Sequence, residues 1–283
     1  MIRFSQDSDL PALYALWQEA FEADAREAEY FFSRRLRREY TLVALDEGRV
    51  LGMLSMLPIS LVVSDKSYPA RYVFAVATLR QFRGQGLSSQ LLDAAHQYMT
   101  VSGEAASVLV PARPSLFDFY GKRGYETRFF IDSLNISSRE IPVHPPAAQL
   151  ASIGAEDYLR LRDGAFGQSS LYVRWDLEAL RFFISSLFGA GGALRIVTPQ
   201  GEAACLYELR DGGARVTELA LHGLGWQDAM AAIHGYLGAP AYTLRMPAGT
   251  LPGAPTQPFG MIRWLAPAPE MQGGAPYLSI AKD

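Results

Sequence analysis

The residues whose types and spacing suggest chemistry lie in the segment 76–87, where an apolar run leads into a glycine loop and then a helical pattern. A strand–loop–helix of this kind directs backbone N–H groups and a positive helix end at one point, which suits a phosphate. Gly84 and Gly86 have no side chains that would keep a phosphate away from the backbone, and Arg83 adds a charged hydrogen-bond donor. Because Ser89 replaces the third glycine of a dinucleotide fingerprint, and no Gly-Lys-Ser/Thr is present, the loop predicts a different anion site. An ordinary strand-to-helix turn is the alternative.

A second motif stands downstream, with the sequence Phe119-Tyr120-Gly121-Lys122-Arg123-Gly124-Tyr125. It begins within a short predicted helix over 115–122, which Gly124 ends as a left-handed cap. Tyr120 is a candidate proton donor in it, because a phenol on a short helix can donate a hydrogen bond to a group beside the helix. The alternative is a core tyrosine packed between sheet and helix.

Together the two motifs resemble GCN5-related N-acetyltransferases, the GNAT family. Gln81-x-x-Gly84-x-Gly86 matches the family signature Gln/Arg-x-x-Gly-x-Gly/Ala, and Val76 stands where the family has a valine. Thr78 stands where the family often has proline. The segment 119–125 looks like the family's Phe-Tyr-x-x-x-Gly-Phe. The resemblance covers about residues 1–137, and it implies acetyl transfer from acetyl-CoA to an amine.

The resemblance also implies the site residues. Tyr120 would be the general acid that protonates the coenzyme A thiolate, and a backbone N–H near Val76 would polarise the thioester carbonyl. The strand 74–78 would splay from its neighbour and pair with the pantetheine arm. The expected cosubstrate-binding residues are Phe74, Val76, Gln81, Phe82, Arg83, Gly84, Gln85, Gly86, Leu87, Ser88, Ser115 and Leu116.

The general base and the acceptor site have no diagnostic pattern. Candidate bases are Glu19, Glu22, Asp24, Asp118, Glu126 and His96, and a water chain is a further option. The similar multi-acetylating enzymes use their C-terminal carboxylate, so Asp283 is a hypothesis for the base. Phe21, Glu22 and Asp24 are expected to face a cationic amine, because the first two helices shape the acceptor pocket in this family.

The elements that must position these residues alternate along the chain. Helical periodicity predicts helices over 10–21, 26–39, 87–100, 155–165, 176–188 and 226–236, and apolar runs predict the strands between them, ending with 261–265 and 277–281. The order helix–helix–three strands–helix–strand occurs twice, which indicates an internal repeat. We expect a mixed α/β (α+β) fold with two GNAT-like domains, each a mostly antiparallel sheet flanked by helices.

The expected domains are 1–140, which binds acetyl-CoA, and 152–283, a degenerate copy, joined by a proline-rich linker over 141–151. This repeat resembles tandem-GNAT acetyltransferases of the enhanced-intracellular-survival type, without the length for their sterol-carrier-like domain. The second copy has Gly223 and Gly225 before a helix, but Ala220 stands where Gln or Arg is expected. We therefore expect no coenzyme A site there.

Composition narrows the function classes. The 283 residues carry a net charge of -3, so a globally basic nucleic-acid binder is excluded. The one cysteine, Cys205, permits no internal disulfide, and its place outside the candidate site favours direct attack in a ternary complex over a covalent enzyme intermediate. The four histidines lack metal-ligand spacing, so no metal is expected. No signal peptide or membrane helix is evident, which predicts a soluble cytoplasmic protein with no membrane partner.

The remaining alternatives concern the acceptor and the class. The acceptor is a small-molecule amine or a peptide, and homo-oligomerisation stays open. A non-catalytic acyl-CoA-binding sensor or scaffold is the rival reading, and a protein or peptide N-acetyltransferase is another.

Overall fold

The computed structural model describes residues 1–21, 25–142, 147–278 and 280–281. The chain forms two compact units, each discontinuous in sequence. The first comprises 1–61, 68–126 and 261–269, and the second comprises 62–67, 127–260 and 270–283. The continuous domain ranges expected from sequence therefore differ from the compact units, because the late strand 261–264 returns to the first unit.

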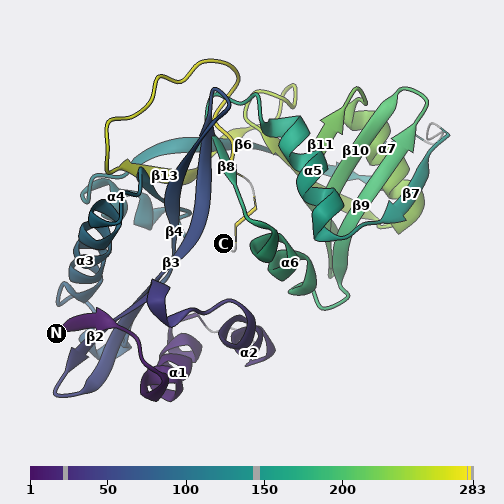
Figure 1. The fold of residues 1–283 in the computed structure, drawn as a ribbon. Helices are drawn as coiled ribbons and strands as arrows, with labels where there is room; N and C mark the ends of the chain where they lie inside the picture. The colour runs from purple at the N-terminus through teal and green to yellow at the C-terminus, as the bar shows by residue number, and fades with distance from the viewer. Residues whose placement is uncertain (22–24, 143–146, 279, 282–283) are drawn as a thin grey trace. The chain divides into compact units, whose positions relative to one another are not determined.

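The first unit combines a sheet, in the strand order β1-β2-β3-β4-β5-β13, with helices (Figure 1). Its strands are β1 (Ile2–Phe4), β2 (Thr41–Asp46), β3 (Arg49–Val63), β4 (Lys66–Thr78), β5 (Ala106–Leu109) and the end of β13 (Thr256–Trp264). Its helices are α1 (Leu10–Phe21), α2 (Ala25–Arg34), α3 (Leu87–Val101) and α4 (Ser115–Gly121). Three short 3-10 turns, Asp7–Asp9, Arg38–Tyr40 and Arg80–Phe82, join them.

The core of the first unit forms between α3 and the sheet. The apolar side of α3, with Leu91, Leu92, Ala95 and Met99 fully buried, packs on strand residues such as Leu54. Each fully buried Leu or Met side chain contributes about 1.5–3 kcal/mol. This packing anchors α3, so the loop that precedes the helix is held at a defined place.

The second unit repeats the arrangement with its own strands, in the order β6-β12-β11-β10-β9-β7. The strands are β6 (Glu126–Ser137), β7 (Gln149–Ser152), β8 (Tyr172–Arg174), β9 (Gly191–Thr198), β10 (Gly201–Arg210), β11 (Gly213–His222) and β12 (Ala241–Pro247). The helices are α5 (Ala155–Phe166), α6 (Leu177–Ser185) and α7 (Trp226–Leu237), with a 3-10 turn at Ser138–Glu140. Figure 1 shows β7, β9, β10 and β11 side by side.

The repeat seen in the sequence has the same strand pairing in both units. In each unit, one helix crosses between two parallel strands, α3 between β4 and β5 and α7 between β11 and β12. The other strand pairs with a printed register in each unit are antiparallel, among them β2–β3 and β10–β11. The mixed α/β class with mostly antiparallel sheets and flanking helices is therefore confirmed.

Some expected elements end elsewhere. The helix expected over 26–39 stops at Arg34, and Arg37 is extended before the 3-10 turn. The strand expected over 277–281 is wrong: within the described residues of this segment only an isolated bridge, Tyr172 to Tyr277, is present. Side chains hold the segment instead, because Trp175 Nε1 donates to the Ile280 carbonyl at 2.9 Å. Residues 149–151 of the expected linker belong to β7, which ends at Ser152. No helix among the described residues is long and apolar enough to cross a membrane.

Candidate functional site

Strand β4 carries a bulge where the site begins. Ala75 has φ +54, a left-handed conformation that is uncommon for a residue with a side chain. Val73 and Val76, three residues apart, both pack on the core beside α3, so the alternation of faces shifts by one residue between them. The parallel pairing of β4 with β5 stops at Tyr72 opposite Val108. The last residues of β4, through Thr78, are therefore not paired with β5.

The glycine loop connects this strand to α3. Gly84 and Gly86 have φ +79 and +82, and a Cβ at either would meet nothing within 4 Å. Gly86 is the N-cap of α3, which starts at Leu87. Within the described residues, the backbone N–H groups from Gly84 to Ser88 donate to no acceptor. Unused donors at a helix N-terminus that is open to solvent form an anion-binding arrangement.

A cavity of about 230 Å³ lies at this loop. Six expected residues line it: Phe82, Arg83, Gly84, Gly86, Leu87 and Ser88. Four residues that the sequence analysis did not assign to it also line it: Thr78, Ser89, Phe119 and Arg123.

Two arginines give the cavity positive charge. Arg83 donates from Nε to the Thr78 carbonyl at 3.1 Å, which fixes the arginine at the end of β4. Arg123 donates to Ser89 Oγ on α3 and lies over the Phe119 ring, 3.5 Å from its centroid. Arg123 stands inside the second sequence motif, but only the packing of α4 against α3 reveals that its side chain reaches the cavity.

Tyr120 lies on α4 beside Phe119, with ring centroids 5.1 Å apart, and the residue is 8% exposed. Burial raises the pKa of its phenol to about 12, although Arg123 opposes this shift. Among the described residues its hydroxyl has no hydrogen-bond partner. The hydroxyl oxygen is also not among the unpaired polar atoms that are completely buried from solvent. Tyr120 is thus a neutral phenol at physiological pH with a free donor that solvent can reach.

The other expected cosubstrate residues are not among those that line the cavity. Gln81, Gln85 and Ser115 are exposed, and Leu116 packs on the core. Phe74 joins an aromatic cluster, which we define as Trp17, Phe21, Phe31, Phe32 and Phe74.

This aromatic cluster lies between α1, α2 and the bulged part of β4. Trp17 stacks on Phe31 with centroids 4.6 Å apart, and Phe74 approaches Phe31 at 5.3 Å. Phe21, 40% exposed, contacts Trp17 at 4.8 Å and presents its ring to solvent. Of the expected acceptor-facing residues, Glu22 and Asp24 lie outside the described residues.

The candidate bases differ in what they already contact. Glu19 accepts a hydrogen bond from the Arg80 backbone N–H. Asp118 and Glu126 are exposed, and Asp283 lies outside the described residues. His96 is 4% exposed, and its two ring nitrogens contact Arg263 and Tyr125. Burial lowers the His96 pKa to about 4, so this histidine is neutral at physiological pH.

The corresponding turn of the second unit is filled by its own chain. Gly223 lies against Gly201, and a Cβ added at Gly201 would be 2.3 Å from the His222 carbonyl oxygen. The His222 ring packs on Gly164 of α5 and contacts the Leu161 carbonyl at 2.7 Å. Backbone and imidazole therefore occupy the space around this turn.

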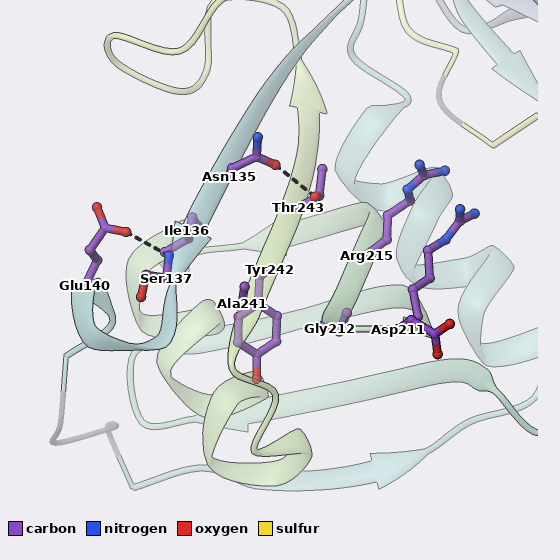
Figure 2. Close-up of a pocket in the computed structure, with 13 residues that line it drawn as sticks. Asn135, Ile136, Ser137, Glu140, Asp211, Gly212, Arg215, Ala241, Tyr242 and Thr243 are labelled. Carbon is purple, nitrogen blue, oxygen red and sulfur yellow. Dashed lines mark hydrogen bonds between the residues drawn. The ribbon is translucent and has the colours of Figure 1, made fainter.

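A larger cavity, of about 470 Å³, lies elsewhere in the second unit, at the starts of β11 and β12 (Figure 2). Among its lining residues, Thr243 Oγ1 donates to Asn135 Oδ1 at 2.9 Å, and the Glu140 carboxylate accepts from the Ser137 backbone N–H at 2.7 Å. Among the described residues, no three His, Cys, Asp or Glu side chains gather as a metal site would require.

Comparisons with known proteins agree with this geometry. Residues 1–128 match the family model of the acetyltransferase (GNAT) domain. No curated protein matches the sequence. Residues 1–128 therefore form a GNAT acetyltransferase domain, which confirms the family resemblance and the expected class, an N-acetyltransferase.

Solved structures share the fold over nearly the whole chain. A probable N-acyltransferase from Enterococcus faecalis is 16% identical with a TM-score of 0.77, covering 94% of this chain and 72% of its own. A GCN5-related N-acetyltransferase from Anabaena variabilis is 17% identical with a TM-score of 0.77, over 94% and 73%. Eis1 from Mycobacterium abscessus is 16% identical with a TM-score of 0.69, over 94% and 74%. At these identities the likeness concerns the fold, and it fits the tandem-GNAT arrangement.

Proposed function

We propose that this chain transfers an acetyl group from acetyl-CoA to a primary amine by direct attack in a ternary complex. The observation that carries the proposal is the cavity of about 230 Å³, where free backbone N–H groups and two arginines converge at the start of α3. Such donors fit a pyrophosphate, because it presents several anionic oxygens at close spacing.

The residues present fit the cosubstrate in the following way. The N–H groups from Gly84 to Ser88 hold the pyrophosphate, and Arg83 and Arg123 supply positive charge. The end of β4 is not paired with β5 and offers backbone groups on that edge to the pantetheine arm, with a backbone N–H near Val76 for the thioester carbonyl. An N–H in that position stabilises the negative charge that develops on the carbonyl oxygen.

The bond changes assign a role to Tyr120. The amine nitrogen attacks the thioester carbonyl carbon, the C–N bond forms, and the C–S bond breaks. Tyr120 donates its phenolic proton to the departing sulfur, and a base removes the proton from the amine. Cys205 takes no part, since it is fully buried and burial raises its thiol pKa to about 12.

For the base we retain the terminal carboxylate of Asp283 as a hypothesis, with a water chain as the alternative. Adding a short Gly-Ser-Gly extension after Asp283 moves this carboxylate while leaving the rest of the chain intact. A fall in kcat with unchanged CoA affinity supports the hypothesis. Unchanged turnover rules it out.

The acceptor is an amine, and the aromatic cluster beside Ala75 supports this class because ring faces attract cations. A small amine is favoured, and a peptide acceptor is the second candidate, since Phe21 is exposed at the edge of the cluster. We propose that the second GNAT-like domain, 152–283, binds no coenzyme A, because its turn is filled by Gly201 and His222. A cytoplasmic site of action fits this cosubstrate.

The test is a thiol-release assay with acetyl-CoA and a panel of amines that includes aminoglycosides, polyamines, amino acids and peptides. Release of thiol that depends on an amine supports the enzyme. Calorimetric binding of CoA with no turnover across the panel favours the rival reading, an acyl-CoA sensor or scaffold. Absence of both binding and turnover overturns the proposal.

A further inference from the structure

Strand β13 brings one charged side chain into the first unit from a distant part of the sequence. Residues 261–264 of β13 pair antiparallel with β5, and Arg263 stands opposite Ser107. Neither the glycine loop nor the motif at 119–125 predicts this arginine, because it follows that motif by well over a hundred residues.

The Arg263 guanidinium bonds to two elements that carry site residues. Its NH1 donates to the Arg123 carbonyl at 2.8 Å, in the turn that follows α4. The same nitrogen donates to His96 Nδ1 on α3 at 2.8 Å. The side chain also lies against Gly124, where a Cβ would be 3.5–3.7 Å from its Nε, Cδ and Cζ atoms. Arg263 therefore ties the end of α4 to the middle of α3.

The bond to His96 sets the direction of a buried hydrogen-bond chain. A guanidinium can only donate, so His96 Nδ1 must accept, and the neutral ring carries its proton on Nε2. His96 Nε2 then donates to Tyr125 Oη at 2.9 Å, and Tyr125 donates to Ser107 Oγ on β5 at 2.6 Å. The chain thus runs from Arg263 through α3 to the strand that Arg263 itself pairs with.

This arrangement matters for the cavity because Arg263 bonds to both elements that contribute residues to it, α3 and the turn after α4. Arg123 and Tyr120 belong to α4 and its following turn, while Ser89 and the loop N–H groups belong to the start of α3. Tyr125, at the far side of the turn, contacts the Tyr120 ring with centroids 5.7 Å apart.

We propose that Arg263 is a positioning residue for the acetyl-transfer site: through the Arg123 carbonyl and His96 it holds Arg123 and Tyr120 in register with the glycine loop. The inference rests on the proposed function, and it makes the activity of the first domain dependent on a strand from the end of the chain.

The test uses the full chain with Arg263→Met, Arg263→Lys and Arg263→Gln, and Arg195→Met as a matched control. Arg195 is a strand arginine of the second unit that pairs with Glu202. The readouts are the Kd for CoA by calorimetry, kcat and KM in the thiol-release assay, and the nitrogen NMR signals of His96. A role confined to stability would leave the kinetics and affinity of the folded protein unchanged.

We expect Arg263→Met to raise the Kd for CoA about tenfold and to lower kcat. A tenfold rise corresponds to the loss of one hydrogen bond between a protein donor and the charged pyrophosphate. His96 loses its single Nε2–H tautomer. Arg263→Lys restores part of the affinity, because an ammonium can donate to one of the two acceptors. Arg195→Met behaves like the wild type.

Wild-type Kd, kcat and His96 signals in folded Arg263→Met would overturn the proposal. If that variant does not fold, Arg263→Gln, which keeps one donor group, decides between the same outcomes. If the wild type binds CoA without turning over any amine, the proposed function fails, and the role of Arg263 is judged on CoA affinity and the His96 tautomer. If the wild type binds no CoA, the proposal falls with the function.

Discussion

Replacing Tyr120 with phenylalanine removes one oxygen atom from the candidate site and little else. The ring stays in place, packed on Phe119 and Tyr125. Because the hydroxyl has no partner among the described residues, its loss leaves no described polar atom unpaired. We therefore expect the free energy of unfolding to change by no more than about 0.5 kcal/mol.

The effect on the reaction is expected to be large. A positioned general acid contributes about 100- to 10,000-fold to a rate. The loss corresponds to about 3–5 kcal/mol in activation free energy. Since burial raises the Tyr120 pKa to about 12, the acid stays protonated across the ordinary assay range, and the defect should be the same at pH 7 and pH 9.

Tyr125→Phe is the matched control, because it removes the same atom from a neighbouring tyrosine. The Tyr125 hydroxyl contacts both His96 and Ser107, so its removal leaves buried polar groups unpaired. We expect a cost of about 1–3 kcal/mol in unfolding free energy. The hydroxyl is committed to these two partners, so at a temperature where the variant is folded its kcat should fall by less than about tenfold.

The assay combines thiol release with CoA calorimetry and urea unfolding. The expected pattern is opposite in the two variants: Tyr120→Phe is stable, binds CoA and is slow, whereas Tyr125→Phe is unstable and active. A Tyr120→Phe variant that retains more than a tenth of wild-type kcat would refute the assignment of this phenol as the general acid. Loss of CoA binding in the same variant would show that the hydroxyl acts in binding instead.

Three further predictions concern the loop, the buried histidine and a buried ion pair. Gly86→Val places a β-branched residue at φ +82, so the CoA affinity measured by calorimetry should fall at least about tenfold. Gly48→Val, at φ +81 in the β2–β3 turn, is the control: it should cost a similar amount of stability, about 1–2 kcal/mol, and leave the CoA affinity unchanged. Equal affinity losses would contradict a phosphate role for the loop. His96 has a folded pKa of about 4 against an ordinary value of 6.5, so the unfolded chain binds the proton more tightly. Stability should be full above about pH 6.5 and fall by about 3 kcal/mol toward pH 4, as urea titrations would measure, with a flatter dependence in His96→Gln. Arg162→Met removes the cation from the fully buried Glu218 carboxylate, although the Tyr158 and Tyr277 hydroxyls still donate to it. We expect a cost of about 3–5 kcal/mol in urea unfolding, more than for the double replacement by methionine, and a cost under about 1 kcal/mol would contradict a buried ion pair.

The amino-acid sequence alone determined the features that depend on neighbouring residues. The glycines at 84 and 86, the strand before them and the helix after them predict the anion loop, because positive φ and helical periodicity are local properties. The repeated element order also followed from local patterns, as did the mixed α/β class. The family match over residues 1–128 then confirmed the resemblance that these motifs carry.

The tertiary structure decided what depends on residues far apart in the chain. Strand β13 joins β5 in the first unit, so Arg263 bonds to His96 and to the Arg123 carbonyl across more than a hundred residues. The bulge at Ala75 likewise depends on packing on both faces of β4. The partner and register of a strand depend on residues far away in the chain, so the local sequence pattern of one strand does not identify the strand it pairs with. For this reason a segment near the end of the chain, which looked like part of a second domain, completes the first.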